Sequence, residues 1–199
     1  LLEAGELPQD PAHGVDTNVP WLALELVDGG AHGTSLFDRV RHAVTHTGAS
    51  IAPSSVLATL HGIARGLDWV HTHGLLHRGL SPNNVLVCGH GVQTIAKVTD
   101  VAIACPQGLP SDFGLAPGRD ERVPIVSSSP YRAPEQYGSD PIGPTVDVFA
   151  FAALARFVLT GHGPSPADPK LEEEPALHPT FRLESDALAE IERTLDKAC

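Results

Sequence analysis

The apolar segment at residues 146–159, VDVFAFAALARFVL, constrains the fold more than any other part of the chain. Apolar residues occupy nearly every side of the helix that this segment would form, so other elements must cover it all round. The segment is interrupted by Asp147 and Arg156, and it is too short to span a membrane. We therefore expect a helix at residues 145–160 in the centre of a hydrophobic core.

Hydrophobic periodicity predicts the elements around this helix. The predicted strands, which would pair as two hairpins, are residues 1–6, 21–27, 84–88 and 95–104. The further predicted helices are residues 35–48, residues 53–74 and a last one from about residue 185. Ser54 or Ser55 would cap the helix that follows Pro53, and Gly74 would end it. The polar segment 105–130 is predicted to be a long loop without regular structure.

Composition and charge exclude several classes of function. The chain has 199 residues, of which 42% are hydrophobic and 19% charged, as in one globular domain with its own core. Its net charge of −11 argues against nucleic acid, or an anionic membrane surface, as the main partner. The three cysteines are odd in number and far apart, so they predict neither a disulfide framework nor a zinc site. A reducing, cytoplasmic location is the simplest expectation.

Five short motifs follow one another in a fixed order. They are LALELVDGG at 22–30, GLLHRGLSPNNVLV at 74–87, KVTDVAIA at 97–104, SSPYRAPEQY at 128–137 and TVDVFAFAALARFVLTGHGP at 145–164. Each motif is weak by itself, but together and in this order they resemble the protein kinase family, and the SPxN loop is similar to that of bacterial Ser/Thr kinases. The resemblance implies an α+β protein-kinase-like fold, mainly the helical C-lobe with a β-hairpin remnant of the N-lobe.

The resemblance also implies a division of the chain. Residues 1–28 would be the last strands and the hinge of an N-lobe, and residues 29–199 a C-lobe truncated at its C-terminal end. The chain has no methionine and begins within an apparent strand, so we expect it to be an internal piece of a longer protein.

A site for ATP and Mg²⁺ follows from the same resemblance. Backbone groups of Glu25 and Val27 would bind adenine, with Leu24 as the gatekeeper. Leu86, on the strand after the catalytic loop, would form the floor below the base.

Two side chains would hold the magnesium ions. Asn84 would bind one ion through its amide oxygen, and Asp100 would bind the other and bridge it to the phosphates. Asp112 is a rival for Asp100, because SDFGLA at 111–116 spells the metal motif of the family letter for letter. Asp100 is the better candidate, since Pro110 would interrupt the strand that leads into Asp112.

The catalytic loop departs from the family pattern at Gly79. The family has an aspartate here, which orients the substrate hydroxyl and accepts its proton, and glycine can do neither. Ser81 stands where a lysine commonly contacts the γ-phosphate, whereas Arg78 keeps its place and would pair with a phosphate on the activation loop. We expect a catalytically impaired, ATP-binding regulatory module with a protein partner. The alternative is an active Ser/Thr protein kinase that transfers the γ-phosphate of ATP to protein substrates.

Two further interpretations concern the support of this loop. The resemblance implies that Asp147 is structural and accepts hydrogen bonds from backbone amides of the catalytic loop. His71, His73 and His77 are close enough in sequence to suggest a metal site, but a helix end rich in surface histidines is the simpler interpretation.

Overall fold

The structure is a computed structural model. It describes residues 3–9, 11–13, 18–47, 51–100, 105–108, 130–138, 140–161 and 163–164. Three predictions lie outside these residues: the rival metal ligand Asp112, most of the loop at 105–130, and the helix expected from residue 185.

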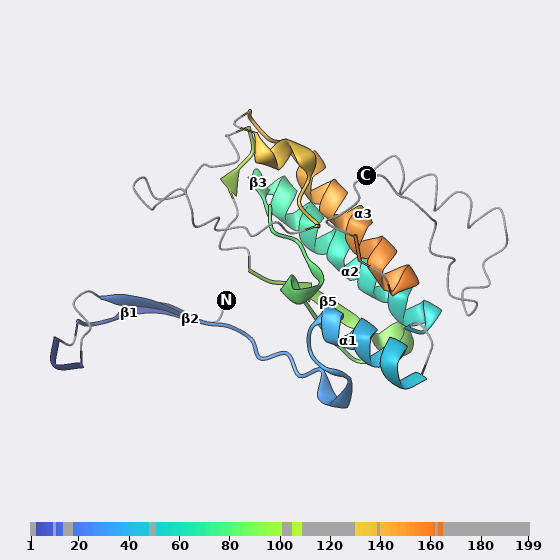
Figure 1. Ribbon diagram of the computed structural model, residues 1–199. Helices are drawn as coiled ribbons and strands as arrows, with labels where there is room; N and C mark the ends of the chain where they lie inside the picture. The colour runs from blue at the N-terminus through green and yellow to red at the C-terminus, as the bar shows by residue number, and fades with distance from the viewer. Residues whose placement is uncertain are drawn as a thin grey trace.

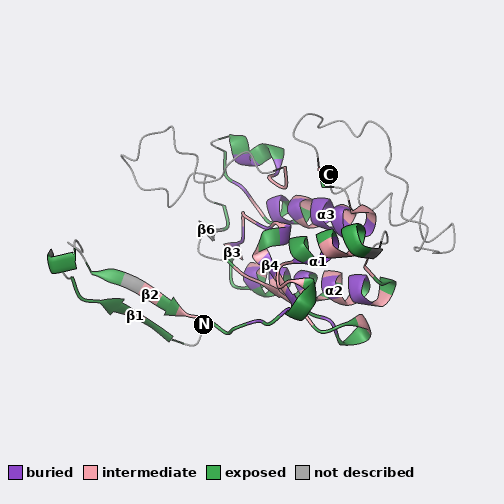
Figure 2. Ribbon diagram, turned by 60° about the horizontal axis from the view of Figure 1, so that its bottom comes forward, coloured by how far each residue is buried: buried purple, intermediate pink, exposed green. Residues whose placement is uncertain are grey.

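Two long helices form the centre of the molecule. Helix α2 (Pro53–Thr72) and helix α3 (Thr145–Thr160) lie side by side (Figure 1) and contact each other directly. Leu154 and Val158 of α3 are buried against Ile63 and Leu67 of α2 in one hydrophobic cluster. Figure 2 shows that most residues of α3 are buried. The predicted central core helix is therefore confirmed, with the bounds expected from the sequence.

The C-terminal end of α3 follows from a glycine. Gly161 has φ 74° and donates from its backbone N to the Phe157 carbonyl at 2.8 Å. A residue with a side chain pays a steric penalty in this left-handed conformation, which glycine avoids.

The start of α2 corrects a prediction. Ala52 is the N-cap residue and Pro53 takes the first helical position, so Ser54 and Ser55 lie inside the helix and neither caps it. Proline is well suited to this position because its fixed φ is helical and it needs no hydrogen-bond acceptor. The hydroxyl of Ser55 instead accepts a hydrogen bond from Gly91 N at 2.7 Å.

The end of α2 agrees with the sequence. Gly74 follows the last residues of the helix with φ 72°, and its N–H donates to the His71 carbonyl.

A short helix, α1 (Leu36–His42), packs beside α2 and α3. The hydroxyl of Ser35 caps it by accepting from Asp38 N at 3.1 Å. The helix expected at 35–48 is α-helical only to His42, and it continues as a π-helical turn, η3 (Ala43–Thr47).

The strands of the described residues form three separate two-stranded antiparallel sheets. The pairs are β1 (Glu3–Leu7) with β2 (Val19–Ala23), β3 (Leu75–Leu76) with β6 (Cys105–Pro106), and β4 (Val85–Cys88) with β5 (Ile95–Val98). The two predicted hairpins are present. The segment 105–130 is not entirely irregular, since its first two residues pair with β3.

The hairpin of β1 and β2 lies apart from the helices (Figure 1) and is mostly exposed (Figure 2). Its apolar side chains include Leu7 and Leu22, both exposed. The second hairpin, β4–β5, by contrast packs closely on α2.

Two glycines of α2 permit this close packing. A Cβ atom at Gly62 would lie 3.1 Å from the Ala96 carbonyl oxygen, and one at Gly66 would lie 3.0 Å from Val98 Cγ2. The i, i+4 spacing puts both glycines on one face of the helix, so strand β5 can approach its backbone.

The short 3₁₀ turns that border the sites are η2 (Gly30–His32), η4 (Pro82–Asn84), η5 (Gly91–Gln93) and η7 (Pro134–Tyr137). Within the described part of the chain, no helix has both the length and the hydrophobicity needed to cross a membrane.

Candidate functional site: the loop between β3 and β4

One buried carboxylate anchors the loop between β3 and β4. Asp147, in the first turn of α3, has an exposed fraction of 0%. Its Oδ2 accepts a hydrogen bond from His77 N, and its Oδ1 accepts one from Arg78 N, both at 2.8 Å. His71 Nε2, on α2, lies 2.8 Å from the same Oδ2. The prediction that Asp147 supports the backbone of this loop is therefore confirmed.

A second buried side chain joins the loop to the end of β5. His77 Nε2 lies 2.9 Å from the Thr99 carbonyl oxygen, and Gly79 N donates to His77 Nδ1 at 3.3 Å. Because a carbonyl only accepts and a backbone amide only donates, these partners put the proton of His77 on Nε2.

The three neighbouring histidines therefore have different surroundings. His77 is buried, His71 binds Asp147, and His73 is exposed and stacks on Trp69 with 4.1 Å between ring centroids. Among the described residues, no group of three His, Cys, Asp or Glu side chains is arranged to hold a metal ion. Only His73 fits the interpretation of surface histidines, because two of the three support the loop.

A glutamine that sequence reasoning missed supports the loop from the other side. Gln136, in η7, is buried; its Nε2 donates to the Arg78 carbonyl at 3.1 Å and its Oε1 accepts from Ala133 N at 3.0 Å. Both the N–H and the C=O of Arg78 are thus bound by side chains distant in the sequence. No local sequence pattern predicts this contact, because Gln136 and Arg78 are 58 residues apart in the sequence.

The backbone at Gly79 does not require a glycine. Gly79 is not among the described glycines with positive φ, so its backbone conformation is open to other residues. Its carbonyl oxygen accepts a hydrogen bond from Asn84 Nδ2 at 2.9 Å. A left-handed backbone therefore does not explain the glycine at this position.

Two residues of this region have unusual backbone angles. Arg78 has φ 64° and Asp100 has φ 61°, and they are the non-glycine residues with positive φ in the described part of the chain. Such conformations cost about 1–3 kcal/mol each and persist where the surrounding contacts hold them, often at functional sites.

The hairpin β4–β5 brings the two candidate metal ligands to the same end. Val85 pairs with Val98, so Asn84 and Asp100 leave the hairpin side by side, and Thr99 N donates to the Asn84 carbonyl at 2.9 Å. The side-chain nitrogen of Asn84 is held by Gly79, which leaves its Oδ1 as an acceptor, and Asp100 is exposed.

Ser81 begins the turn that carries Asn84. It has an extended backbone with φ −154°, and its carbonyl accepts from Asn84 N at 3.0 Å. Its hydroxyl makes no cap hydrogen bond to the turn.

The candidate hinge approaches the candidate floor of the nucleotide site through an ion pair. Lys97 on β5 pairs in register with Leu86, and its Nζ binds the carboxylate of Glu25. Leu86 is half-buried, Val27 is buried, and Leu24 is 56% exposed. The Glu25–Lys97 pair is itself exposed, so it contributes little to stability. No local sequence pattern predicts that Lys97 binds Glu25, because the two residues are far apart in the chain.

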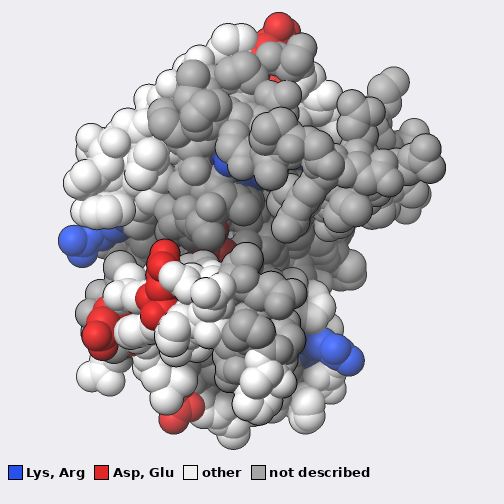
Figure 3. Space-filling view, turned by 90° about the vertical axis from the view of Figure 1, so that its left-hand side faces the viewer, with Lys and Arg blue, Asp and Glu red and all other residues white. Residues whose placement is uncertain are grey.

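Charged side chains do not gather into a broad basic surface on the face shown in Figure 3. There, the described Lys and Arg side chains lie at separate positions among uncharged and acidic ones.

The comparisons with known proteins agree with this arrangement. The family model described as the protein kinase domain matches residues 15–197. The serine/threonine-protein kinase PknL of Mycobacterium tuberculosis is 30% identical over 163 residues, 79% of this chain and 35% of the relative. The calcium/calmodulin-dependent protein kinase cmkB of Emericella nidulans is 32% identical over 159 residues, 77% of this chain and 35% of the relative.

A third relative, the probable serine/threonine-protein kinase PkwA of Thermomonospora curvata, is 27% identical over 154 residues, 75% of this chain and 17% of the relative. The chain thus spans about a third, or less, of the length of these relatives. The match to the family model nevertheless covers most of the chain, and the chain belongs to the protein kinase family, with its α+β protein-kinase-like fold.

Proposed function

We propose that the chain is an ATP-binding protein kinase homologue with impaired phosphoryl transfer, which acts as a regulatory or binding module for a protein partner. In this proposal residues 1–28 are the last strands and hinge of an N-lobe, and residues 29–199 belong to a C-lobe.

The observation that carries the proposal is Gly79 in a loop whose other contacts are formed. Phosphoryl transfer to a hydroxyl group is helped by a carboxylate that orients the hydroxyl and takes its proton. Glycine has no side-chain carboxylate and can do neither. Loss of a general base typically lowers a rate by about 10²–10⁴-fold. Gly79 is not among the described glycines with positive φ, so the backbone angle alone gives no reason for a glycine here, which supports the proposal.

The nucleotide site would use the groups already described. Backbone groups of Glu25 and Val27 would bind adenine beside Leu24, and Leu86 would lie below the base. Asn84 and Asp100 offer an amide oxygen and a carboxylate, hard oxygen ligands of the kind that Mg²⁺ prefers. Bound magnesium would neutralise charge on the phosphates. Arg78 would pair with a phosphorylated residue of the activation loop.

An active Ser/Thr protein kinase remains the second candidate. It is favoured by the three relatives reported above, because each carries protein kinase in its printed name. In that case a group other than residue 79 would accept the proton, at a lower rate.

The two candidates are separated by a transfer assay on the full-length protein. Transfer of the γ-phosphate is measured with magnesium for the parent, for Gly79→Asp, and for Gly79→Ala as a control that adds a side chain without a carboxylate. We expect Gly79→Asp to exceed the parent by about 10²-fold or more and Gly79→Ala to match the parent. Parent turnover equal to that of Gly79→Asp would instead establish the active kinase.

Nucleotide binding is tested separately by thermal unfolding with and without ATP and magnesium. A ligand that binds only the native state raises the melting temperature. We expect a rise in the parent that is lost in Asp100→Ala and kept in Asp140→Ala, an exposed carboxylate at a distance in the sequence. Loss in Asp112→Ala with retention in Asp100→Ala would transfer the metal role to Asp112.

A further inference from the structure

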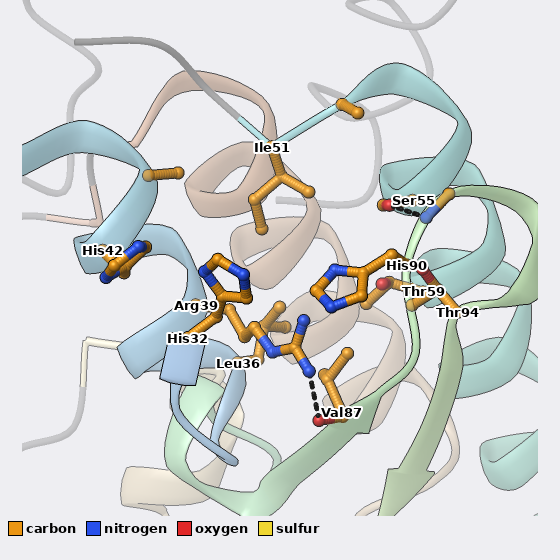
Figure 4. Close-up of a pocket in the computed structure, with 13 residues that line it drawn as sticks. His32, Leu36, Arg39, His42, Ile51, Ser55, Thr59, Val87, His90 and Thr94 are labelled. Carbon is orange, nitrogen blue, oxygen red and sulfur yellow. Dashed lines mark hydrogen bonds between the residues drawn. The ribbon is translucent and has the colours of Figure 1, made fainter. Parts of the chain in front are cut away.

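A pocket outside the candidate nucleotide site lies between η2, α1, the start of α2 and η5. Its volume is about 270 Å³. The polar residues around it that matter here are His32, Arg39, His42, His90 and Thr94 (Figure 4). None of these residues belongs to the predicted nucleotide, metal or catalytic groups.

Arg39 brings a buried positive charge to this pocket. Its side chain donates to the carbonyls of Gly33 (Nε, 2.9 Å), Gly89 (Nη1, 3.2 Å), Gly29 and Val87 (Nη2, 3.0 and 3.1 Å). Those acceptors are neutral, and no carboxylate of the described residues forms an ion pair with Arg39. One N–H of Nη1 is not used by these bonds, and the charge is balanced only by carbonyl dipoles.

Histidine rings surround the same space. The ring of His32 meets His42 edge-on, with centroids 4.7 Å apart, and meets His90 edge-on at 5.0 Å. Behind them, His46 stacks on His42 at 4.2 Å. Figure 4 shows the rings of His32, His42 and His90 in the neighbourhood of the Arg39 guanidinium.

The described residues that line the pocket include one arginine and three histidines but no carboxylate. The pKa of His42 is lowered, first by loss of hydration and then by His46, His32 and Arg39. The carboxylate on α1, Asp38, accepts a hydrogen bond from Ser35 Oγ and does not line the pocket.

Among the described residues, the other elements add no carboxylate to the lining. Besides Arg39 and the three histidines, the described lining residues are uncharged: Leu36, Ala43, Ile51, Ala52, Ser55, Thr59, Val87, Gly91 and Thr94. Burial lowers the pKa of Arg39. A smaller opposite effect comes from Cys88, on β4 next to the pocket, whose charge would raise it.

A hydroxyl in the wall has no hydrogen-bond partner. Thr94 Oγ1 is buried and binds no other group of the described residues. A buried hydroxyl without a partner is costly, and a ligand oxygen would satisfy it.

We propose that this pocket binds a small molecule through an oxyanion group, a carboxylate or a phosphate. The remaining N–H of Arg39, the ring N–H groups of the histidines and the Thr94 hydroxyl are donors, and an oxyanion would supply both the missing acceptors and the missing negative charge. A pocket of about 270 Å³ is at the small end for organic ligands, so the ligand is a small one. A metal ion is not the occupant, because the rings contact one another instead of converging on one point.

The test uses the full-length protein and two probes, sulfate and malonate, at constant ionic strength set with sodium chloride. Sulfate keeps its charge between pH 6 and pH 8, and malonate presents carboxylates. Binding is followed by NMR of the histidine ring protons, which report on this pocket directly. The variants are His42→Gln and His90→Gln, and the control is His61→Gln, an exposed histidine of α2 outside the pocket.

We expect saturable binding of at least one probe, with chemical-shift changes confined to the pocket histidines. Binding should weaken about tenfold or more in each pocket variant and stay unchanged in His61→Gln. Affinity should also fall from pH 6 to pH 8, because a bound anion favours the protonated histidines and its binding takes up protons. A response that never saturates, or equal binding by the pocket variants and the parent, would overturn the proposal. The probe that binds more tightly identifies the oxyanion as tetrahedral or as a carboxylate.

Discussion

Removal of the Asp147 carboxylate should destabilise the protein, because this carboxylate holds the loop between β3 and β4. Three donors reach this side chain at 2.8 Å: the backbone N–H groups of His77 and Arg78, and His71 Nε2. In Asp147→Ala all three lose their acceptor, inside a site where Asp147 itself has no exposed surface.

The size of the effect follows from these contacts. A hydrogen bond to a charged group contributes about 1.5–3 kcal/mol to the free energy of unfolding. The net loss in Asp147→Ala is smaller than the sum of three such bonds, because the variant is also relieved of the cost of burying a charge. Removing one partner from a buried charged network typically costs about 3–5 kcal/mol. We therefore expect Asp147→Ala to lower the free energy of unfolding by about 4 kcal/mol, a large part of the total of an ordinary domain.

Urea unfolding followed by circular dichroism measures this loss, with the m-value as a check on two-state behaviour. Asp147→Asn is the graded variant: it keeps one acceptor, but its NH₂ group would face an N–H donor, so we expect a loss of about 2–3 kcal/mol. Asp68→Ala, at an exposed position on α2, is the control and should change stability by less than about 0.5 kcal/mol. A loss of less than about 1 kcal/mol in Asp147→Ala would refute the assigned role.

Three further predictions address the rest of the fold. Ser35→Ala should lower the free energy of unfolding by about 1 kcal/mol because it removes the cap of α1, whereas Ser54→Ala, inside α2, should leave it nearly unchanged; urea unfolding of the two variants checks this. Gly62→Val should lower it by about 1–3 kcal/mol, since its Cβ would lie 3.1 Å from the Ala96 carbonyl oxygen, and a stability equal to the parent would mean that β5 is not so close. Burial raises the pKa of Tyr131 to about 12, so the unfolded state releases this proton first as the pH rises from its ordinary pKa of about 10. Stability should therefore fall between pH 10 and pH 12 in the parent, and fall less in Tyr131→Phe; equal slopes would contradict this.

The parts of the fold that the sequence predicts are those with a local cause. The helix α3 follows from a run that is apolar on all sides and from Gly161, which ends it, and both features lie within the helix or directly beside it. The hairpin β4–β5 likewise follows from two apolar runs around a turn that contains Gly89 and Gly91, both with positive φ.

The cap of α2 shows where local chemistry misleads. Both serine and proline are common at the start of a helix. In this chain Pro53 takes the first helical position of α2, and the Ser55 hydroxyl accepts a hydrogen bond from Gly91 N instead of capping the helix. That choice depends on η5, which reaches α2 only in the folded chain. The same holds for Gln136 and Lys97, whose partners Arg78 and Glu25 are distant in the sequence.

The functional sites likewise have a part that the sequence predicts and a part that it does not. The pairing of Asn84 with Thr99 depends on the register of a hairpin that periodicity predicts, so the position of Asn84 and Asp100 at the same end of this hairpin was accessible from the sequence. The pocket between η2, α1, α2 and η5 was not accessible from the sequence, because its histidines come from η2, α1 and the β4–β5 turn. Hydrogen bonds from Arg39 to four backbone carbonyls hold these elements together.

The contacts of the loop between β3 and β4 also explain how the fold forms with Gly79 in this position. The bonds that hold this loop run to the backbone of His77 and Arg78, to the His77 ring, and to the carbonyl of Gly79 itself. No described bond needs a side chain at residue 79, so the loop forms whether or not a carboxylate is present there. If residue 79 has the proposed role, an aspartate introduced there should raise the reaction rate, while urea unfolding should show that the hydrogen bonds of the loop are kept.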